Sequence, residues 1–318
     1  MPETPQQSPR VVAVVVTFNR RALLERLLGA LDGTPGLAEV VVVDNASTDG
    51  TGDWLRVSTG STTEGGSTTP VHAVTLPENR GGAGGFHEGL RLALERGADL
   101  AWLMDDDGVP EDGCLARLLE HAGDLDFWGP AVLSEQDPSR LCFPIRLPGR
   151  TQVVHEMADV EAAAAMSGGV LPDIVIPFNG VLVTRALADR IGLPREEFFI
   201  WGDDHEYRLR AEAAGARIAT ITGARFLHPA TDDLGTPMMF GRTTYNHSPS
   251  DLKHYCMARN NVVNLREHRG WLLVLAFVLK TVWFYAFTRP SPHRLRLSAE
   301  GVRAGLRNDF TGHRRFLQ

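Results

Sequence analysis

Three adjacent carboxylates, Asp105, Asp106 and Asp107, are the residues in this sequence best placed to do chemistry. They directly follow the apolar segment 100–104. Carboxylates this close repel one another unless a cation compensates their charge. Alternate side chains of an extended backbone point the same way, so Asp105 and Asp107 can share a hard divalent ion such as Mg²⁺ or Mn²⁺. Such an ion can hold a diphosphate and neutralise its charge as it leaves.

Two other interpretations of this acidic cluster compete with a metal site. The cluster could be a solvated acidic turn, or it could end a Walker-B strand. The second interpretation requires a GxxxxGK[ST] phosphate loop, and the sequence contains none. A phosphate-loop ATPase is therefore disfavoured.

Asp203 and Asp204 form a second acidic group ahead of a helix predicted over 206–214. Adjacent carboxylates raise each other's pKa, which can tune one of them as a general base. Asp203 could instead serve as the N-cap of the helix. His228 follows a strand predicted over 218–222, and a lone histidine is more often structural than a ligand.

Buried strands alternating with helices must position these residues. The apolar runs predict strands at 11–16, 40–43, 71–76 and 100–104, separated by helices at 21–31, 51–56 and 85–96. This alternation is typical of an α/β fold with a mostly parallel sheet, in which ligands bind at the carboxyl ends of the strands. Beyond Gly108 the pattern is less regular, with further strands at 178–183 and 218–222.

The order of the motifs resembles that of family 2 glycosyltransferases of the GT-A fold, from about Val11 to about Pro229. Among subfamilies the chain is most similar to actinobacterial galactofuranosyltransferases, through the Asn79–Phe86 run, the triple aspartate, Phe143–Ile145 and Tyr255–Asn260. The matching motifs are Thr17–Arg20, Asp44–Ser47, Asn79–Phe86, Met104–Asp107, Phe178–Gly180, Trp201–Glu206 and Leu227–Pro229.

The resemblance implies a role for each of these motifs. It assigns the nucleotide and its diphosphate to Thr17, Asn19 and Arg20, and the base or ribose to Asp44. It makes His228 a metal ligand together with Asp105 and Asp107. It also places Asp105 and Asp106 in contact with the bound nucleotide sugar. It favours Asp204 over the neighbouring Asp203 as the base that removes the proton of the acceptor hydroxyl. From the residues alone, Asp44 could equally be a turn residue bonded to its own loop.

The glycines after Asn79 are expected to let the backbone approach the donor sugar and phosphates, with Gly81 and Gly82 closest. Their spacing is not that of a GxGxxG fingerprint, and they follow the third strand rather than the first. The alternative is a loose loop that leads into a helix.

The function implied by the resemblance is an inverting, metal-dependent hexosyl transfer that uses Mn²⁺ or Mg²⁺. The expected donor is a nucleotide diphosphate sugar, with UDP-galactofuranose the best candidate, and the expected acceptor is a hydroxyl of a cell-envelope or polyprenyl-diphosphate-linked glycan. A rhamnosyltransferase that uses dTDP-rhamnose is a close variant. A nucleotidyltransferase needs a Gly-rich basic signature near its first strand, which Thr17–Arg20 does not supply. A non-catalytic sugar-nucleotide-binding protein would not need the full set of acidic residues.

Charge and hydropathy divide the chain into two parts. The net charge of −7 argues against nucleic-acid binding, yet the segment from Lys280 onward has eight basic and two acidic residues. We expect a catalytic domain at 1–230, with a nucleotide-sugar half at 11–108 and an acceptor half at 109–230. A helical, basic, membrane-associating region follows at 231–318.

The apolar segment Trp271–Phe287 could lie on an anionic membrane surface, pack on the protein or span the bilayer. Scattered cysteines and a polar N-terminus favour a cytoplasmic protein that is peripheral on the inner face of the membrane. The sequence does not disclose the oligomeric state.

Overall fold

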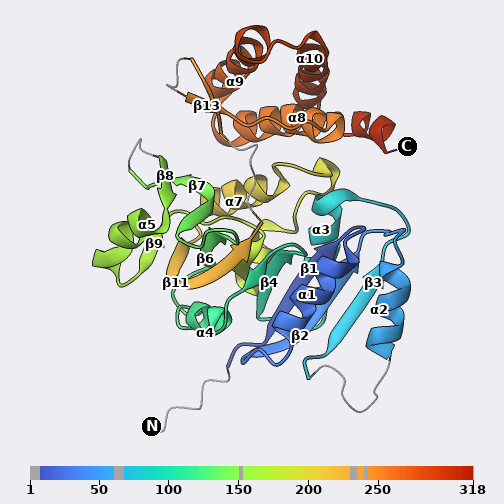
Figure 1. Ribbon diagram of the computed structural model, residues 1–318, viewed down its shortest axis with the longest axis vertical. Coiled ribbons are helices and arrows are strands. Elements are labelled where there is room, and N and C mark those ends of the chain that lie inside the picture. Colours follow the sequence, from blue (N-terminus) through green and yellow to red (C-terminus); the bar gives the residue numbers. More distant parts are fainter. Residues whose placement is uncertain (1–7, 61–67, 150–152, 230–234, 240–242, 318) are drawn as a thin grey trace.

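Four parallel strands form one half of the sheet, in the spatial order β3-β2-β1-β4 (Figure 1). The computed structural model describes residues 8–60, 68–149, 153–229, 235–239 and 243–317. The strands are β1 (Val11–Thr17), β2 (Leu37–Asp44), β3 (Val71–Thr75) and β4 (Leu100–Asp105). The helices between them are α1 (Arg21–Leu31), α2 (Thr51–Gly60) and α3 (Gly81–Glu95). The predicted α/β alternation is confirmed.

The second half extends the same sheet with mixed strand directions. The order continues β4-β10-β6-β11-β5, in which β10 is antiparallel to both neighbours and β6 is parallel to β11. The strands are β5 (Val109–Pro110), β6 (Phe127–Ser134), β7 (Arg140–Arg146), β8 (Val153–Glu156), β9 (Val170–Pro172), β10 (Asn179–Thr184) and β11 (Ile218–His228). The helices are α4 (Cys114–Leu119), α5 (Met157–Ala164), α6 (Arg185–Ile191) and α7 (Asp203–Ala213).

Side chains on both faces of the sheet are buried, as the continuous apolar runs predict. Along β1, Val11, Ala13 and Val15 join a cluster with α1, α2 and α4. The alternate residues Val12, Val14 and Val16 join a second cluster with α3, α6 and α7. The strands are thus held rigidly, and only their carboxyl ends are free to carry polar groups.

The C-terminal residues form a helical layer over the sheet domain. In Figure 1, α8 lies between the sheet domain and the two remaining long helices. The layer consists of α8 (Asp251–His268), α9 (Trp271–Trp283), a π-helical turn (Phe284–Thr288) and α10 (Pro292–Arg307), with a short hairpin of β12 (Thr236–Met238) and β13 (Thr243–Tyr245). The boundary expected near Ala230 lies outside the described residues.

Two of the differences from the sequence-based ranges affect the site. Helix α3 begins at Gly81, so most of the glycine-rich segment is the first turn of a helix rather than a loop. Strand β11 continues to His228, six residues beyond the predicted end, through an irregularity between Ile221 and Arg225. This extension brings His228 to the same level as Ser134, the last residue of β6.

Candidate active site

The carboxyl ends of the first strands bring the predicted donor residues together. Thr17 ends β1 beside Asp44, which ends β2, and Val16 is paired with Asp105 at the end of β4. These positions are set by the parallel register alone. The candidate site therefore lies where ligands bind in open α/β sheets.

Asp106 links two of the predicted nucleotide-binding residues to the acidic cluster. The buried Thr17 hydroxyl donates to its carboxylate at 2.6 Å, and the Arg20 guanidinium lies at 3.1 Å. Burial raises the pKa of Asp106, although the Thr17 hydrogen bond and the charge of Arg20 act against that rise. Asp106 and Thr17 thus fasten β4 to β1, while Arg20 stays half exposed and available to a ligand.

Asp107 lies between two cationic side chains. The Arg20 guanidinium is 2.8 Å from one of its oxygens, and the imidazole Nε2 of His228 is 3.2 Å from the other. Burial would raise the pKa of Asp107, but the interactions with His228 and Arg20 outweigh it and lower the pKa. Burial likewise opposes protonation of His228, but Asp107 and Cys142 raise its pKa to about 10. A protonated His228 therefore places a positive charge beside Asp107.

The residues at this edge have the chemistry of a divalent cation site, although they do not converge on one. Among the described residues, no three His, Cys, Asp or Glu side chains are grouped closely enough to hold an ion. Nδ1 of His228 lies 2.8 Å from the Pro229 carbonyl oxygen. A hydrogen bond there fixes the tautomer whose Nε2 can bind a metal. Burial and the charges of Asp107 and Asp106 raise the pKa of Asp105 well above its usual value, a strain that a cation would relieve.

Asp44 and Asn19 hold the two loops that follow β1 and β2. Asp44 is fully buried and accepts a hydrogen bond from the Ser47 backbone at 3.0 Å, which is the turn alternative considered above. Its second oxygen has no hydrogen-bond partner among the described residues. Asn19 accepts from the Thr48 backbone at 2.7 Å and has a left-handed φ of 54°. A cavity of about 550 Å³ opens beside these loops, lined by Ser47, Thr48, Gly52 and Thr75 among others.

The glycine-rich turn is organised by Asn45, a residue to which sequence reasoning gave no role. Its side-chain amide donates to Asn79 at 3.1 Å and to the Gly81 carbonyl at 2.9 Å. Gly81 has a φ of +70°, and a Cβ there would overlap the Phe199 carbonyl. Because Gly81 has no side chain, the backbone of Phe199 can pack against it. Gly82 has open space in front of it, so of the two glycines it is the one that a ligand could approach.

Asp203 and Asp204 are the first two residues of α7. Gly202 is the N-cap and no side chain caps the helix, so the capping role considered for Asp203 is not what the structure shows. Burial and the neighbouring Asp204 raise the pKa of Asp203 to about 8. Burial also raises the pKa of Asp204, whose carboxylate accepts a hydrogen bond from the His205 backbone at 2.6 Å. The charge of Asp203 also contributes to the raised pKa of Asp105, so the two acidic groups lie close enough to interact.

The segment Phe198–Gly202, which delivers the acidic pair, is strained and is held from α8. Phe199 and Trp201 have positive φ values of 66° and 70°, which are costly for bulky residues. The Asn260 amide nitrogen lies 2.8–3.1 Å from three carbonyl oxygens of this segment. Arg259 donates to the Phe198 carbonyl at 2.7 Å, and both α8 side chains are fully buried.

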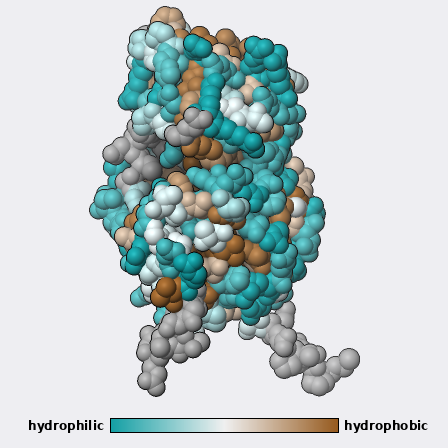
Figure 2. Space-filling model, turned by 90° about the vertical axis from the view of Figure 1, so that its right-hand side faces the viewer, coloured by the Kyte–Doolittle hydropathy of each residue, from teal (hydrophilic) through white to brown (hydrophobic). Residues whose placement is uncertain are grey.

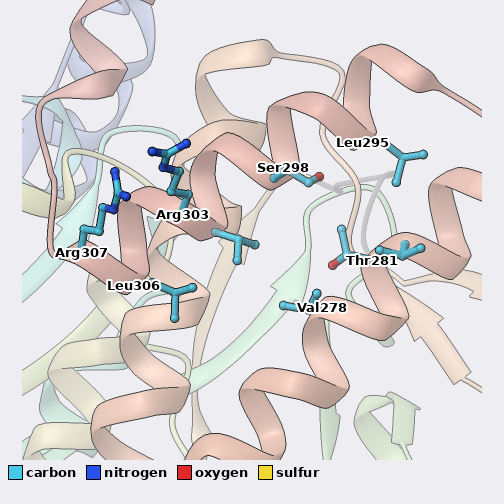
Figure 3. A pocket seen from close by; sticks show the side chains of 10 residues that line it. Val278, Thr281, Leu295, Ser298, Arg303, Leu306 and Arg307 are labelled. Atoms are coloured by element: carbon cyan, nitrogen blue, oxygen red, sulfur yellow. The ribbon is translucent and has the colours of Figure 1, made fainter.

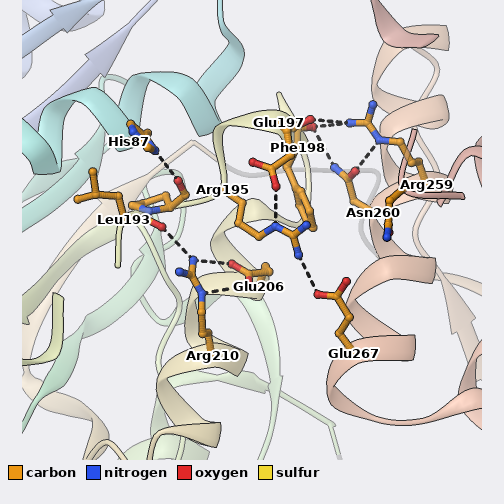
Figure 4. A network of polar contacts seen from close by, with 12 residues as sticks. His87, Leu193, Arg195, Glu197, Phe198, Glu206, Arg210, Arg259, Asn260 and Glu267 are labelled. Carbon is orange, nitrogen blue, oxygen red and sulfur yellow. Dashed lines mark hydrogen bonds and ion pairs between the residues drawn. The ribbon is translucent and has the colours of Figure 1, made fainter. Parts of the chain in front are cut away.

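Figure 4 shows how further ion pairs continue this network on either side of the segment. Arg195 contacts Glu197 and, across the interface, Glu267 of α8, each at 2.8 Å. Arg210 pairs with the buried Glu206 of α7 at 2.8 Å. The sequence pointed to Arg259 and Asn260 only as part of the Tyr255–Asn260 motif and gave neither residue a role.

Comparison with known proteins agrees with this geometry. Residues 12–152 match the family described as Glycosyl transferase family 2. The chain is 33% identical to galactofuranosyltransferase GlfT1 of Mycolicibacterium smegmatis, over 94% of this chain and 97% of the relative. It is 25% identical to the dTDP-rhamnosyl transferase RfbF of Shigella flexneri, over 83% and 82% of the two chains.

A solved structure shares the fold. The chain superposes on mannosyltransferase PcManGT from Pyrobaculum calidifontis, in complex with GDP-Man and Mn²⁺, with a TM-score of 0.53 and 19% identity. The match covers 98% of this chain and 79% of that protein. The sheet is therefore of the GT-A type. From the motifs, the carboxyl-edge geometry and these likenesses together, the chain belongs to the family 2 glycosyltransferases and is similar over nearly its whole length to mycobacterial galactofuranosyltransferases.

Proposed function

We propose that this glycosyltransferase moves a galactofuranosyl group from UDP-galactofuranose, with inversion, onto a hydroxyl of a lipid-linked cell-envelope glycan, and that it uses Mn²⁺ or Mg²⁺. The observation that carries the proposal is the pair of acidic groups that lie close enough to interact, one at the end of β4 and one at the start of α7. The similarity to galactofuranosyltransferases over 94% of the chain supports the choice of sugar.

On the donor side, Asp105, Asp107 and His228 would hold the cation. When bound, the ion neutralises the charge that develops on the departing diphosphate. Arg20 is half exposed beside Asp107 and can contact the same diphosphate. Gly82 and Asn79 would line the approach of the sugar, while Asn19 and Asp44 shape the loops around the nucleotide.

On the acceptor side, Asp204 would take the proton of the attacking hydroxyl. Two adjacent carboxylates do not both ionise readily near neutral pH, and burial together with the neighbouring Asp204 raises the pKa of Asp203 to about 8. We propose that the pair carries one negative charge, with Asp203 protonated and Asp204 the base. A deprotonated acceptor oxygen that attacks opposite the leaving diphosphate inverts the anomeric carbon in a single displacement. No covalent intermediate is needed.

The C-terminal layer supports a position at the membrane surface. Segment Trp271–Thr288 is apolar and long enough to cross a bilayer. Of its residues, 22% are buried against the rest of the protein. One face packs through Val274, Thr281, Phe284 and Tyr285, and the other exposes Leu272 to 79% and Phe287 to 70%. Figure 2 shows hydrophobic side chains at the surface of this upper layer between hydrophilic ones. A helix packed on one face and exposed on the other suits an interfacial anchor on the cytoplasmic side.

The catalytic proposal is tested by incubating the purified protein with Mn²⁺, a synthetic polyprenyl-diphosphate glycan and either UDP-galactofuranose or dTDP-rhamnose. We expect acceptor-dependent release of UDP and a product in which the new linkage has the opposite anomeric configuration to the donor. EDTA should stop the reaction. Turnover with dTDP-rhamnose alone would replace the galactofuranosyl assignment, and nucleotide binding without transfer would overturn the enzymatic one.

The membrane proposal is tested by sedimentation with vesicles that contain anionic phospholipid. The full chain should pellet with them, and the double variant Leu272→Asp, Leu279→Asp should stay in the supernatant. Burying each leucine side chain is worth about 1.5–3 kcal/mol, so the loss should exceed tenfold. Equal pelleting of both proteins would contradict an interfacial role for this face.

A further inference from the structure

A groove of about 420 Å³ lies between α9 and α10, away from the acidic site. Its volume falls within the range of about 300–1,000 Å³ that is typical of small-ligand sites. Val278 lines it from α9, and Leu295, Ala299, Val302 and Leu306 line it from α10. In Figure 3 the side chains of both helices point into the space between them.

The two hydroxyl groups in the wall of this groove are already bonded inside the protein. The Thr281 hydroxyl donates to the Phe277 carbonyl at 2.9 Å and contacts the Tyr245 hydroxyl at 3.0 Å. The Ser298 hydroxyl lies 2.8 Å from Nε2 of the buried His254. The groove therefore offers an occupant branched aliphatic surface, which favours an apolar chain rather than a sugar or a nucleotide.

One end of the groove is strongly cationic. Arg303 and Arg307 lie one helical turn apart at that end, opposite Leu295 and Thr281 (Figure 3). Neither arginine forms an ion pair within the part of the chain that the structure describes. Other arginines on the same helix do, since Arg294 pairs with Asp251 and Arg296 with Glu300. Both guanidinium groups are exposed and like-charged, and Arg307 also interacts with the carboxylate of Asp309, whose pKa it helps to lower, so this end of the groove can accept a further anion.

We propose that this groove binds the isoprenoid chain of the acceptor's lipid carrier and that Arg303 and Arg307 bind the phosphate at the head of that chain. The inference rests on the proposed function, since it assumes a lipid-linked acceptor. The apolar wall matches the branched hydrocarbon, and guanidinium groups bind phosphate well because their donors match its oxygens. The exposed apolar face of α9 would lie in the membrane from which the chain is drawn. The groove would thereby hold the carrier while its sugars reach past α8 to Asp204.

Direct binding of farnesyl phosphate, measured by isothermal titration with the full chain, tests the site without any catalysis. Ala299→Trp should fill the groove, and the double variant Arg303→Gln, Arg307→Gln should remove the phosphate contacts. We expect each to weaken binding at least tenfold. Ala276→Trp is the matched control, because Ala276 is an exposed alanine of α9 outside the groove, and its affinity should equal that of the wild type.

Several results would overturn the site. These are unchanged affinity in both groove variants, equal loss in Ala276→Trp, equal binding of farnesol, and equally effective competition by a two-chain phospholipid. Circular dichroism and thermal unfolding of each variant show whether it is folded, and the two kinds of groove variant act through different chemistry. A folding defect in one therefore leaves the other as the test.

Transfer assays separate this inference from the proposed function. The same glycan is offered either on a polyprenyl diphosphate or as a methyl glycoside. The groove variants should raise KM for the lipid-linked acceptor at least tenfold and leave the methyl glycoside unchanged. If KM rises equally for both acceptors, or rises for neither, the groove does not bind the lipid carrier. A wild-type enzyme that transfers to neither acceptor contradicts the proposed function instead, whatever the binding of farnesyl phosphate.

Discussion

The two acidic groups of this protein lie close enough to interact but are built differently. In the β4 group, Asp106 and Asp107 are contacted by Thr17, Arg20 and His228, so their negative charge is largely compensated. In the α7 group, neither Asp203 nor Asp204 forms an ion pair within the described residues. The second group is stabilised mainly by backbone N–H groups at the start of a helix.

We propose that this difference separates donor binding from proton transfer. Asp107 is matched by Arg20 and His228, has a lowered pKa and stays ionised, which suits the binding of a charged donor, whereas Asp105 and Asp106 of the same group have raised pKa values. Buried carboxylates without cationic partners have raised pKa values, which bring them closer to the pH at which a general base works best. The same residue type thus serves two purposes because its surroundings differ.

Removing the base should produce the largest effect. Asp204→Asn keeps the size of the side chain but cannot accept the hydroxyl proton, so kcat should fall by about 10²–10⁴-fold. The dissociation constant for UDP in the presence of Mn²⁺ should not change. Steady-state kinetics and titration calorimetry measure the two quantities. Near-normal turnover would show that Asp204 is not the base and that the two acidic groups do not differ in this function.

Removing a carboxylate from the β4 group should instead weaken donor binding. Asp107→Ala should lower the affinity for UDP in the presence of Mn²⁺ at least about tenfold, or roughly 1.4 kcal/mol. The difference in affinity with and without Mn²⁺ should disappear. Asp112→Ala, which removes an exposed carboxylate close by, serves as the control and should bind normally. Retained Mn²⁺ dependence in Asp107→Ala would contradict the metal assignment.

Removing the contacts from α8 that support the α7 group should have a smaller effect on turnover. Asn260→Ala leaves the Ile200 and Trp201 carbonyls of the strained segment without their donor, and each unsatisfied buried group costs about 1–3 kcal/mol. We expect lower thermal stability and a kcat reduced by about tenfold, with donor affinity retained. Asn261→Ala, the half-buried neighbour, should change neither quantity. If the two variants behave alike, α8 does not position the acidic pair.

The dependence of stability on pH should show the smallest effect. Because the pKa of Asp203 is raised from 3.8 to about 8 in the folded state, the folded protein binds this proton more tightly than the unfolded chain does. The resulting stability is fully present below pH 4 and is lost as the pH rises through 8. The slope is at most about 1.4 kcal/mol per pH unit.

Asp203→Asn removes this loss of stability. The free energy of unfolding, measured with urea between pH 4 and pH 9, should therefore increase in the variant relative to the wild type as the pH rises. A difference between the two proteins that is constant over this range would mean that Asp203 ionises normally in the folded state.

The sequence alone determined the first half of the fold and most of the donor edge. Uninterrupted valine runs are stable only where both faces of a strand are covered, so β1, β2 and the helices between them follow from hydropathy. In a parallel sheet the ends of such strands lie side by side, which is why Thr17, Asp44 and Asp105 could be grouped without coordinates. These are consequences of local pattern and of one simple topology.

Only the tertiary structure decided what each of those residues contacts. It showed that Thr17 and Asp44 are buried and bonded within the protein, that Gly81 admits the Phe199 backbone, and that Asn45, Arg259 and Asn260 hold the site together. The residues of α8 lie about 60 positions from the segment that they support. No local pattern encodes such a contact, because it depends on how a helix packs back over the sheet and which buried polar groups then need partners.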